Sequence, residues 1–154
     1  MKPVIVSIDV PQTPEQVYGF LDVMAHHERF TDHYLTGWRF SGPARGVGSC
    51  ATVTAALGGT KTEVTITVVE AEAPRRIVEH NVSAAGRRLA HGTYAIEPLR
   101  TGGTHVSFTY TWLRAPLADR LLAPVVRTTM RHANRTVMQR LASELARHVS
   151  GANS

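Results

Sequence analysis

The sequence is poor in cysteine and in acidic residues, and it has no long apolar run. Cys50 is the single cysteine among 154 residues, so no internal disulfide can form and a reducing compartment is favoured. No stretch approaches the roughly 20 apolar residues that a transmembrane helix needs. Residues 1–9 alternate in polarity and lack the apolar core and cleavage site of a signal peptide. We therefore expect a cytoplasmic protein.

The sequence does contain enough apolar material for one ordinary hydrophobic core. Apolar residues make up 43% of it, and its length is that of one domain. A chain of this size buries roughly two-thirds of its unfolded surface, so its core needs neither metal nor disulfide for support. We predict a single domain over residues 1–150, and a flexible tail over residues 151–154 because these are small and polar.

The shortage of acid leaves a formal net charge of +5, from 17 basic and 12 acidic residues. Residues 116–149 contribute most of the excess, because they contain six arginines against Asp119 and Glu144. Such a concentration is typical of proteins that bind nucleic acid, an anionic membrane or an acidic ligand. No aromatic residues are interleaved with these arginines and no DNA- or RNA-binding signature is present, so we predict no nucleic-acid partner. An anionic membrane surface or an acyl-carrier protein stays open as a peripheral partner.

Hydrophobic periodicity predicts an α+β protein with one long helix at its end. Thr13, Pro14 and Gln16 form the signature of a capped helix start. Gly58-Gly59 is typical of a two-residue hairpin turn. The predicted order is a strand at 3–10, short helices to about 22 and at about 26–32, six strands between 34 and 113, and a long helix at 116–149.

The long helix has one apolar stripe with arginines along both margins, as in a helix half sunk into a sheet with its edges solvated. Pro124 lies in its first turns and should bend or interrupt it. A seven-stranded antiparallel sheet buries its apolar face by curling around such a helix, and the two rarely fill all the space between them, so we expect an apolar cavity. The stripe comprises Val126, Met130, Ala133, Val137, Leu141 and Leu145, and the margins comprise Arg127, Arg131, Arg135, Arg140 and Arg147.

Four short phrases resemble the turns and caps of a known superfamily. They are residues 10–18 (VPQTPEQVY), 46–48 (GVG), 68–76 (VVEAEAPRR) and 102–106 (GGTHV). With the order of elements, they resemble the helix-grip fold of the SRPBCC superfamily over essentially the whole chain. That superfamily includes START-type lipid carriers, pollen-allergen-like proteins and polyketide cyclases. The resemblance implies an elongated hydrophobic cavity that binds lipids, steroids, polyketides or other apolar molecules, and that in some members cyclises or dehydrates a bound polyketide.

Several side chains are predicted to face this cavity. Tyr110 and Trp112 each combine an apolar body with one polar atom that needs a partner when buried, which suits the orientation of a ligand. Asn134 lies on the apolar arc of the long helix, where it must find hydrogen bonds to the sheet, to water or to a ligand. The predicted ligand-binding residues are Trp38, Val64, Ile66, Phe108, Tyr110, Trp112, Met130, Asn134 and Val137.

His91 and Tyr110 are the catalytic candidates. If the last hairpin pairs residue 110 with residue 91, both side chains face the cavity and form a potential acid–base pair. A shift of one residue would replace His91 by Tyr94. The sequence leaves the facing of His80, Tyr94 and His105 open in the same way.

Histidines and acids are concentrated in residues 26–33, which invites a metal-site interpretation. The spacing matches no zinc pattern, so we predict no metal, and no feature indicates a cofactor. We expect this segment to lie at the mouth of the cavity, where Tyr34 would help to gate it. The cluster comprises His26, His27, Glu28, Asp32 and His33.

The leading hypothesis is a helix-grip protein, monomeric or homodimeric, that binds a hydrophobic small molecule such as a lipid or polyketide between sheet and helix. An enzyme of the polyketide cyclase/dehydratase type, using cavity Tyr, His or Asn, is the first alternative. Residues 49–57 and 61–70, where a cyclase arginine would be sought, contain none, which disfavours it. A stress or regulatory interaction module is the second alternative.

Overall fold

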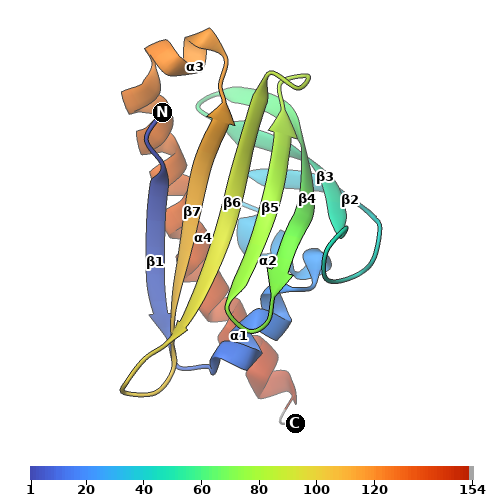
Figure 1. Cartoon of the computed structure of the whole chain (residues 1–154), viewed down its shortest axis with the longest axis vertical. Helices are drawn as coiled ribbons and strands as arrows, with labels where there is room; N and C mark the ends of the chain where they lie inside the picture. Colours follow the sequence, from blue (N-terminus) through green and yellow to red (C-terminus); the bar gives the residue numbers. More distant parts are fainter. Residues whose placement is uncertain (153–154) are drawn as a thin grey trace.

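The computed structural model describes residues 1–152, and it has the predicted order of elements (Figure 1). The N-terminal strand, the short helices and the six-strand meander all appear within about two residues of their predicted positions. The elements are β1 (Val4–Val10), α1 (Pro14–Leu21), the 3-10 turn η1 (Met24–His26), α2 (His27–Thr31), β2 (Leu35–Ser41), β3 (Cys50–Leu57), β4 (Thr60–Glu72), β5 (Arg76–Ser83), β6 (Arg88–Pro98), β7 (Thr104–Arg114), α3 (Leu117–Leu121) and α4 (Ala123–Ala152).

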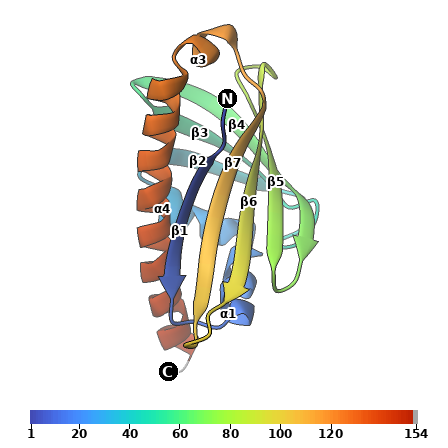
Figure 2. The ribbon, with the colours of Figure 1, turned by 60° about the vertical axis from the view of Figure 1, so that its left-hand side comes forward.

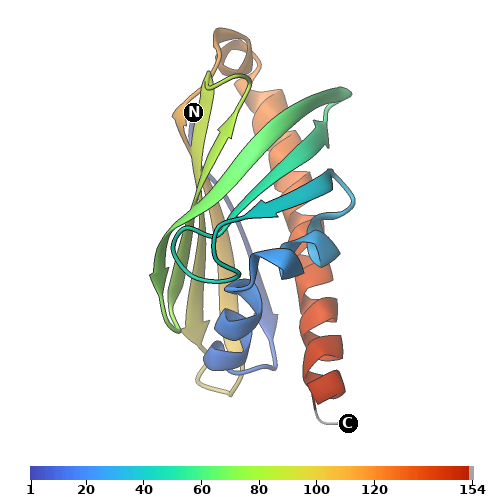
Figure 3. The same ribbon diagram turned by 90° about the vertical axis from the view of Figure 1, so that its right-hand side faces the viewer.

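The seven strands form one antiparallel sheet in the order β1-β7-β6-β5-β4-β3-β2. Chain neighbours pair throughout, and β1 closes the far edge against β7. The sheet bends so strongly that β2, β3 and β4 cross over toward α4, which lies along its concave side (Figure 3). At the other edge β1 runs beside α4 (Figure 2). This is the helix-grip fold, as predicted.

The start of α1 has the predicted cap. The Gln16 amide donates to Thr13 Oγ1 at 3.2 Å, and the Thr13 amide donates to Gln16 Oε1 at 2.9 Å. These two bonds satisfy backbone donors that the first helical turn would otherwise leave free. The cap thus turns the chain sharply out of β1 and directs α1 under the open end of the sheet.

The predicted single helix at 116–149 is wrong in one respect, because it is two helices. The helical conformation is interrupted at Leu122, between α3 and α4. Pro124 lies in the first turn of α4, where a backbone N–H would have no partner within the helix, so its absence costs nothing. The predicted interruption at Pro124 is thus confirmed. The helix also continues to Ala152, so Gly151, predicted to lie in a flexible tail, is helical. Residues 153 and 154 of that predicted tail lie outside the described residues.

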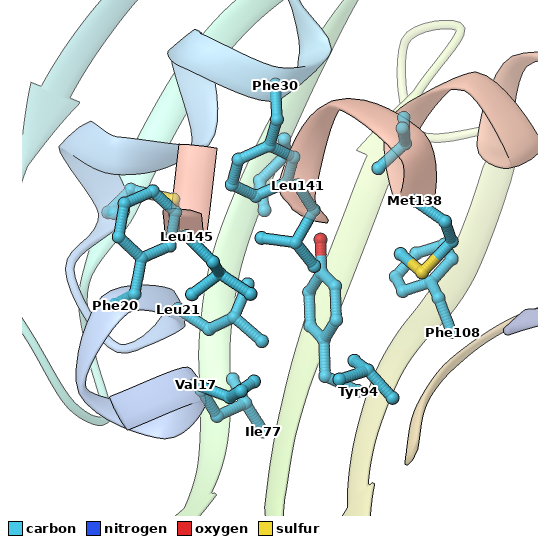
Figure 4. Packing of buried hydrophobic residues seen from close by; sticks show 14 of the residues in the cluster. Val17, Phe20, Leu21, Phe30, Ile77, Tyr94, Phe108, Met138, Leu141 and Leu145 are labelled. Carbon is cyan, nitrogen blue, oxygen red and sulfur yellow. The ribbon is translucent and has the colours of Figure 1, made fainter. Parts of the chain in front are cut away.

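The hydrophobic core fills one end of the space between sheet and helix. Leu141 and Leu145 from the C-terminal half of α4 pack with Phe20, Phe30 and residues of α1 and β5 (Figure 4). Leu141, Leu145 and Phe30 have no solvent exposure. Beside the N-terminal half of α4 the packed core gives way to a cavity between the helix and the sheet.

Candidate functional site

A cavity of about 330 Å³ lies between the N-terminal half of α4 and the concave face of the sheet. Its walls are predominantly apolar and aromatic, which is typical of a small-molecule site. All nine predicted ligand-binding residues line it: Trp38, Val64, Ile66, Phe108, Tyr110, Trp112, Met130, Asn134 and Val137. The residues are placed as predicted; their role in binding stays a prediction.

The mouth of the cavity lies between the β3–β4 hairpin and the start of α4. Gly58, Thr60, Leu122 and Val125 line the cavity and are also solvent-exposed. The prediction that residues 26–33 lie at the mouth is wrong. His27 and Thr31 from that segment line the cavity as buried side chains, at its inner end.

One wall of the cavity has a stripe of polar residues along β5 that the sequence pattern does not predict. Glu79, Asn81 and Ser83 are all buried and line the cavity, with exposures of 4%, 7% and 6%. An alternating strand normally turns its polar residues to solvent, and here they face inward. On the neighbouring strand Gly92 pairs with Glu79, and a Cβ there would come within 3.0 Å of Phe108, so glycine keeps this part of the wall open.

Glu79 forms a buried ion pair with His27 of α2. His27 Nδ1 lies 3.3 Å from Glu79 Oε1, and His27 Nε2 lies 2.7 Å from the carbonyl oxygen of Leu21. Because a carbonyl can only accept, Nε2 carries a proton and donates it to Leu21. Burial alone would lower the pKa of His27, but the contact with the Glu79 carboxylate and its negative charge outweigh burial and raise it.

Two phenols face the same inner region. Burial raises the pKa of Tyr94 well above its ordinary value, and the charge of Glu79 raises it further. The pKa of Tyr34 is raised by burial first, with smaller contributions from Tyr110 and Glu79. Both hydroxyls therefore stay protonated at neutral pH and are available as hydrogen-bond donors. Figure 4 shows the ring of Tyr94 rising from β6 toward α4.

Near the mouth, Arg88 of β6 forms an ion pair with Asp119 of α3. Arg88 Nε donates to Asp119 Oδ2 at 2.7 Å, and Arg88 Nη1 donates to Ser83 Oγ at 3.3 Å. The pair fastens α3, which has no buried residue of its own, to the sheet. Burial raises the pKa of Tyr110 beside it to about 12. The cavity thus contains an arginine, on β6 and not on the two strands, 49–57 and 61–70, where a cyclase arginine would be sought.

Of the two registers left open by the sequence, the one that pairs residue 110 with residue 91 does not occur. Tyr110 pairs with Gly92, and His91 pairs with Thr111, so His91 lies on the outer face of the sheet. There its ring contacts His80 of β5, with centroids 5.4 Å apart. The one-residue alternative is the observed one, because Tyr94 lines the cavity. Because His91 does not face the cavity, the structure gives no reason to treat it as a catalytic residue, whereas Tyr110 lines the cavity as predicted.

His105 also lies on the outer face, where Nδ1 is 2.5 Å from Asp9 Oδ1. The histidines of residues 26–33 turn to separate partners, since His26 Nδ1 donates to Phe20 O and His33 Nε2 donates to Ala133 O. Among residues 1–152, no three His, Cys, Asp or Glu side chains are grouped to hold a metal ion.

Asn134 and Glu79 each present an unpaired polar atom to the cavity. Asn134 is 1% exposed, and within the described residues its Nδ2 donor has no hydrogen-bond partner. Glu79 Oε1 stands at ion-pair distance from His27 but has no aligned hydrogen bond. Buried polar groups normally have partners, so these two atoms mark where a ligand or water would bind.

The curved sheet, the gripping helix and the cavity between them are the features of the helix-grip fold. A family model described as "Polyketide cyclase / dehydrase and lipid transport" matches residues 1–149, and the chain belongs to that family. A comparison with the curated proteins finds no match. Within the described chain, no helix is both long and apolar enough to cross a bilayer.

Solved structures with the same fold include three bacterial proteins. TTHA0849 from Thermus thermophilus has a TM-score of 0.76 at 18% identity, over 96% of this chain and 99% of that one. A START superfamily protein from Mycobacterium smegmatis has a TM-score of 0.75 at 10% identity, over 94% and 97%. The Zhui aromatase/cyclase from Streptomyces has a TM-score of 0.74 at 15% identity, over 96% and 95%. At these identities the similarity establishes the fold alone.

Proposed function

We propose that the protein binds a hydrophobic small molecule, such as a lipid or a polyketide, in the cavity between the sheet and α4. The observation that carries this proposal is the cavity of about 330 Å³ with mostly apolar walls, which opens between Leu122, Val125 and the β3–β4 hairpin. Leaving such walls in contact with water is unfavourable, and an apolar ligand would remove them from it. A carrier of this kind would act in the cytoplasm.

Thermal unfolding in the presence of palmitate and of pyrene tests this proposal. A ligand that binds only the folded protein stabilises it by about 2.7 kcal/mol at 100 times its dissociation constant. For a domain of this size we expect the melting temperature to rise by roughly 5 °C or more with at least one of the two compounds. A melting temperature that neither compound moves, at concentrations up to their solubility, would contradict the proposal.

An enzyme of the cyclase/dehydratase type is the second candidate, and Arg88 is the observation that favours it. Arg88, Tyr110 and the His27–Glu79 pair place a cation, a phenol and a carboxylate–imidazole pair in one cavity. Such groups can polarise a carbonyl and transfer protons. However, Asp119 already neutralises Arg88, so the cation is less available than in a free guanidinium site. The carrier function is therefore the better supported of the two.

We further propose that the mouth exchanges its ligand at an anionic membrane. Beside it the structure has an exposed apolar rim, defined as Leu117, Leu121, Leu122 and Val125, with exposures of 57–74%. Arg120 is exposed within the same segment and Arg114 just before it. An apolar rim among cations, continuous with the walls of an apolar cavity, is complementary to a bilayer of anionic lipids.

Co-sedimentation with vesicles tests this partner. We expect the native protein to bind phosphatidylcholine vesicles that contain phosphatidylglycerol, and to bind them more weakly at high salt. A Leu117→Asp, Leu121→Asp variant should bind these vesicles at least about tenfold more weakly, because two apolar contacts are lost. The Val69→Asp variant, changed at an exposed valine away from the rim, should bind as the native protein does. Equal vesicle binding by all three proteins would show that the apolar rim is not the membrane contact. No binding by the native protein would exclude a membrane and favour an acidic carrier protein as the partner.

A further inference from the structure

The inner end of the cavity has an unused acceptor and an unused donor, both deeply buried. Glu79 Oε1 is the acceptor, whose only contact is the ion pair with His27 Nδ1 at 3.3 Å, and Asn134 Nδ2 is the donor; neither has a hydrogen-bond partner in the part of the chain that the structure describes. The two side chains are 4% and 1% exposed, and both line the cavity. They come from opposite walls, since Glu79 lies on β5 and Asn134 on α4. A ligand between the walls would therefore meet both.

The charge at this end selects against ionic ligands. His27 Nδ1 faces the Glu79 carboxylate at 3.3 Å, and the second ring nitrogen is held by the Leu21 carbonyl, so the pair is neutral as a whole. An ammonium group would find the carboxylate already compensated, and it would have to lose its hydration. A ligand carboxylate would face the Glu79 carboxylate directly. A neutral hydrogen-bond donor is the group that the site accommodates at the lowest cost.

The surroundings select the rest of the ligand. Apolar and aromatic side chains lie next to the polar pair. The ring of Tyr94 contacts the ring of His27 edge to face, with centroids 5.8 Å apart, and contacts the tilted ring of Phe108, with centroids 4.8 Å apart. Ile66 and Val137 close the walls above them. An apolar skeleton of flat rings or a chain fits these walls, and its polar group would have to point at Glu79.

We propose that the inner end of the cavity recognises a hydroxyl group on a neutral apolar ligand, with the hydroxyl donating to Glu79 and Asn134 donating to an oxygen of the same ligand. The proposal rests on the proposed ligand-binding function and adds the polarity of the ligand to it. A hydroxyl both donates and accepts, so it can satisfy a carboxylate without bringing a charge into the cavity. A hydrogen bond to an ionised acceptor is among the stronger ones in proteins, which makes it selective.

The test compares pyrene with 1-hydroxypyrene, which have the same apolar skeleton and differ by one hydroxyl. We expect the native protein to bind 1-hydroxypyrene roughly tenfold more tightly than pyrene, as followed by fluorescence titration. The His27→Phe, Glu79→Met variant removes the ion pair without leaving an unpaired charge, and so avoids the risk of unfolding. In this variant the ratio of the two dissociation constants should fall to about one. The Glu63→Gln variant, changed at an exposed glutamate outside the cavity, should keep the native ratio.

The outcomes separate this inference from the proposed function. If the native protein binds neither compound, the ligand-binding function itself fails. If it binds both equally, or if the double variant keeps the full preference for 1-hydroxypyrene, the cavity binds apolar molecules but the hydroxyl site at Glu79 is refuted. An Asn134→Leu variant then tests the second half of the site, because it should weaken the preference while leaving the His27–Glu79 pair in place.

Discussion

Replacing Glu79 by leucine should lower the free energy of unfolding by about 3–5 kcal/mol, the range typical of removing one partner from a buried ion pair. The variant leaves His27 buried with no carboxylate to compensate its charge. Below the ordinary histidine pKa of about 6.5, the folded variant must either bury an unpaired imidazolium or release its proton, and both cost free energy. Urea unfolding of the native protein and the variant measures the difference.

The same substitution should reverse the pH dependence that His27 gives to stability. In the native protein the folded pKa of His27 is raised, so its stabilisation is fully present below the ordinary histidine pKa of about 6.5 and is lost as the pH rises through the folded value. In the variant, burial is the largest influence that remains, and it lowers that pKa against the smaller opposing effects of the Leu21 carbonyl and the Asp22 charge, so His27 destabilises the fold as the pH falls through about 6.5. The difference in the free energy of unfolding between the native protein and the variant should therefore be larger at about pH 5.5 than at about pH 9.

The Glu63→Leu variant is the matched control for this experiment. Glu63 pairs with Arg39 on the surface, and both side chains are 69% exposed. Surface ion pairs contribute about 0–1 kcal/mol, so the control should unfold almost as the native protein does at every pH. If Glu79→Leu matched the control in size and pH dependence, the buried pair described here would not exist in solution.

Filling the cavity should abolish ligand binding without harming the fold. Val126 and Thr129 lie on α4 and line the cavity without being fully buried. A Val126→Trp, Thr129→Trp variant would place two indole rings in the space that the ligand needs. Because the rings enter a hollow and bury apolar surface, we expect a melting temperature equal to the native one or higher, and no detectable binding of pyrene.

A variant with the same chemistry outside the cavity separates filling from a general effect of tryptophan. Val47 and Val69 are 59% and 39% exposed, and neither lines the cavity. The Val47→Trp, Val69→Trp variant should bind pyrene with the native affinity. Native-like binding by the cavity-filled variant would place the ligand elsewhere on the protein.

The sequence predicts the fold and the apolar walls of the cavity well, for a physical reason. Strand and helix periodicities are set by burial on one face, and both are visible in the sequence without knowledge of strand register. The walls at Val64, Ile66 and Phe108 follow from alternation, and those at Met130 and Val137 follow from the helical stripe. The break before α4 was likewise foreseeable from Pro124, although the separate helix α3 was not.

The polar parts of the site could not be predicted, because their positions depend on strand register and because the polar residues of β5 face the interior and not the solvent. In β5 the alternating residues Glu79, Asn81 and Ser83 would normally be assigned to solvent, and nothing local indicates that this strand turns them inward. The partner of Glu79, His27, is 52 residues earlier, in a segment that the sequence predicts at the cavity mouth. A slip of one residue between β6 and β7 decides whether His91 or Tyr94 enters the cavity, and the turn alone does not fix it.

Native mass spectrometry of the purified protein tests the central claim most directly. We expect the native protein to carry the mass of an apolar molecule retained from the expressing cell, and organic extraction should release it. The Val126→Trp, Thr129→Trp variant, purified in parallel, should show the mass of the protein alone. A native protein that carries no ligand and acquires none on incubation with palmitate or pyrene would contradict the claim that this cavity is a binding site for hydrophobic molecules.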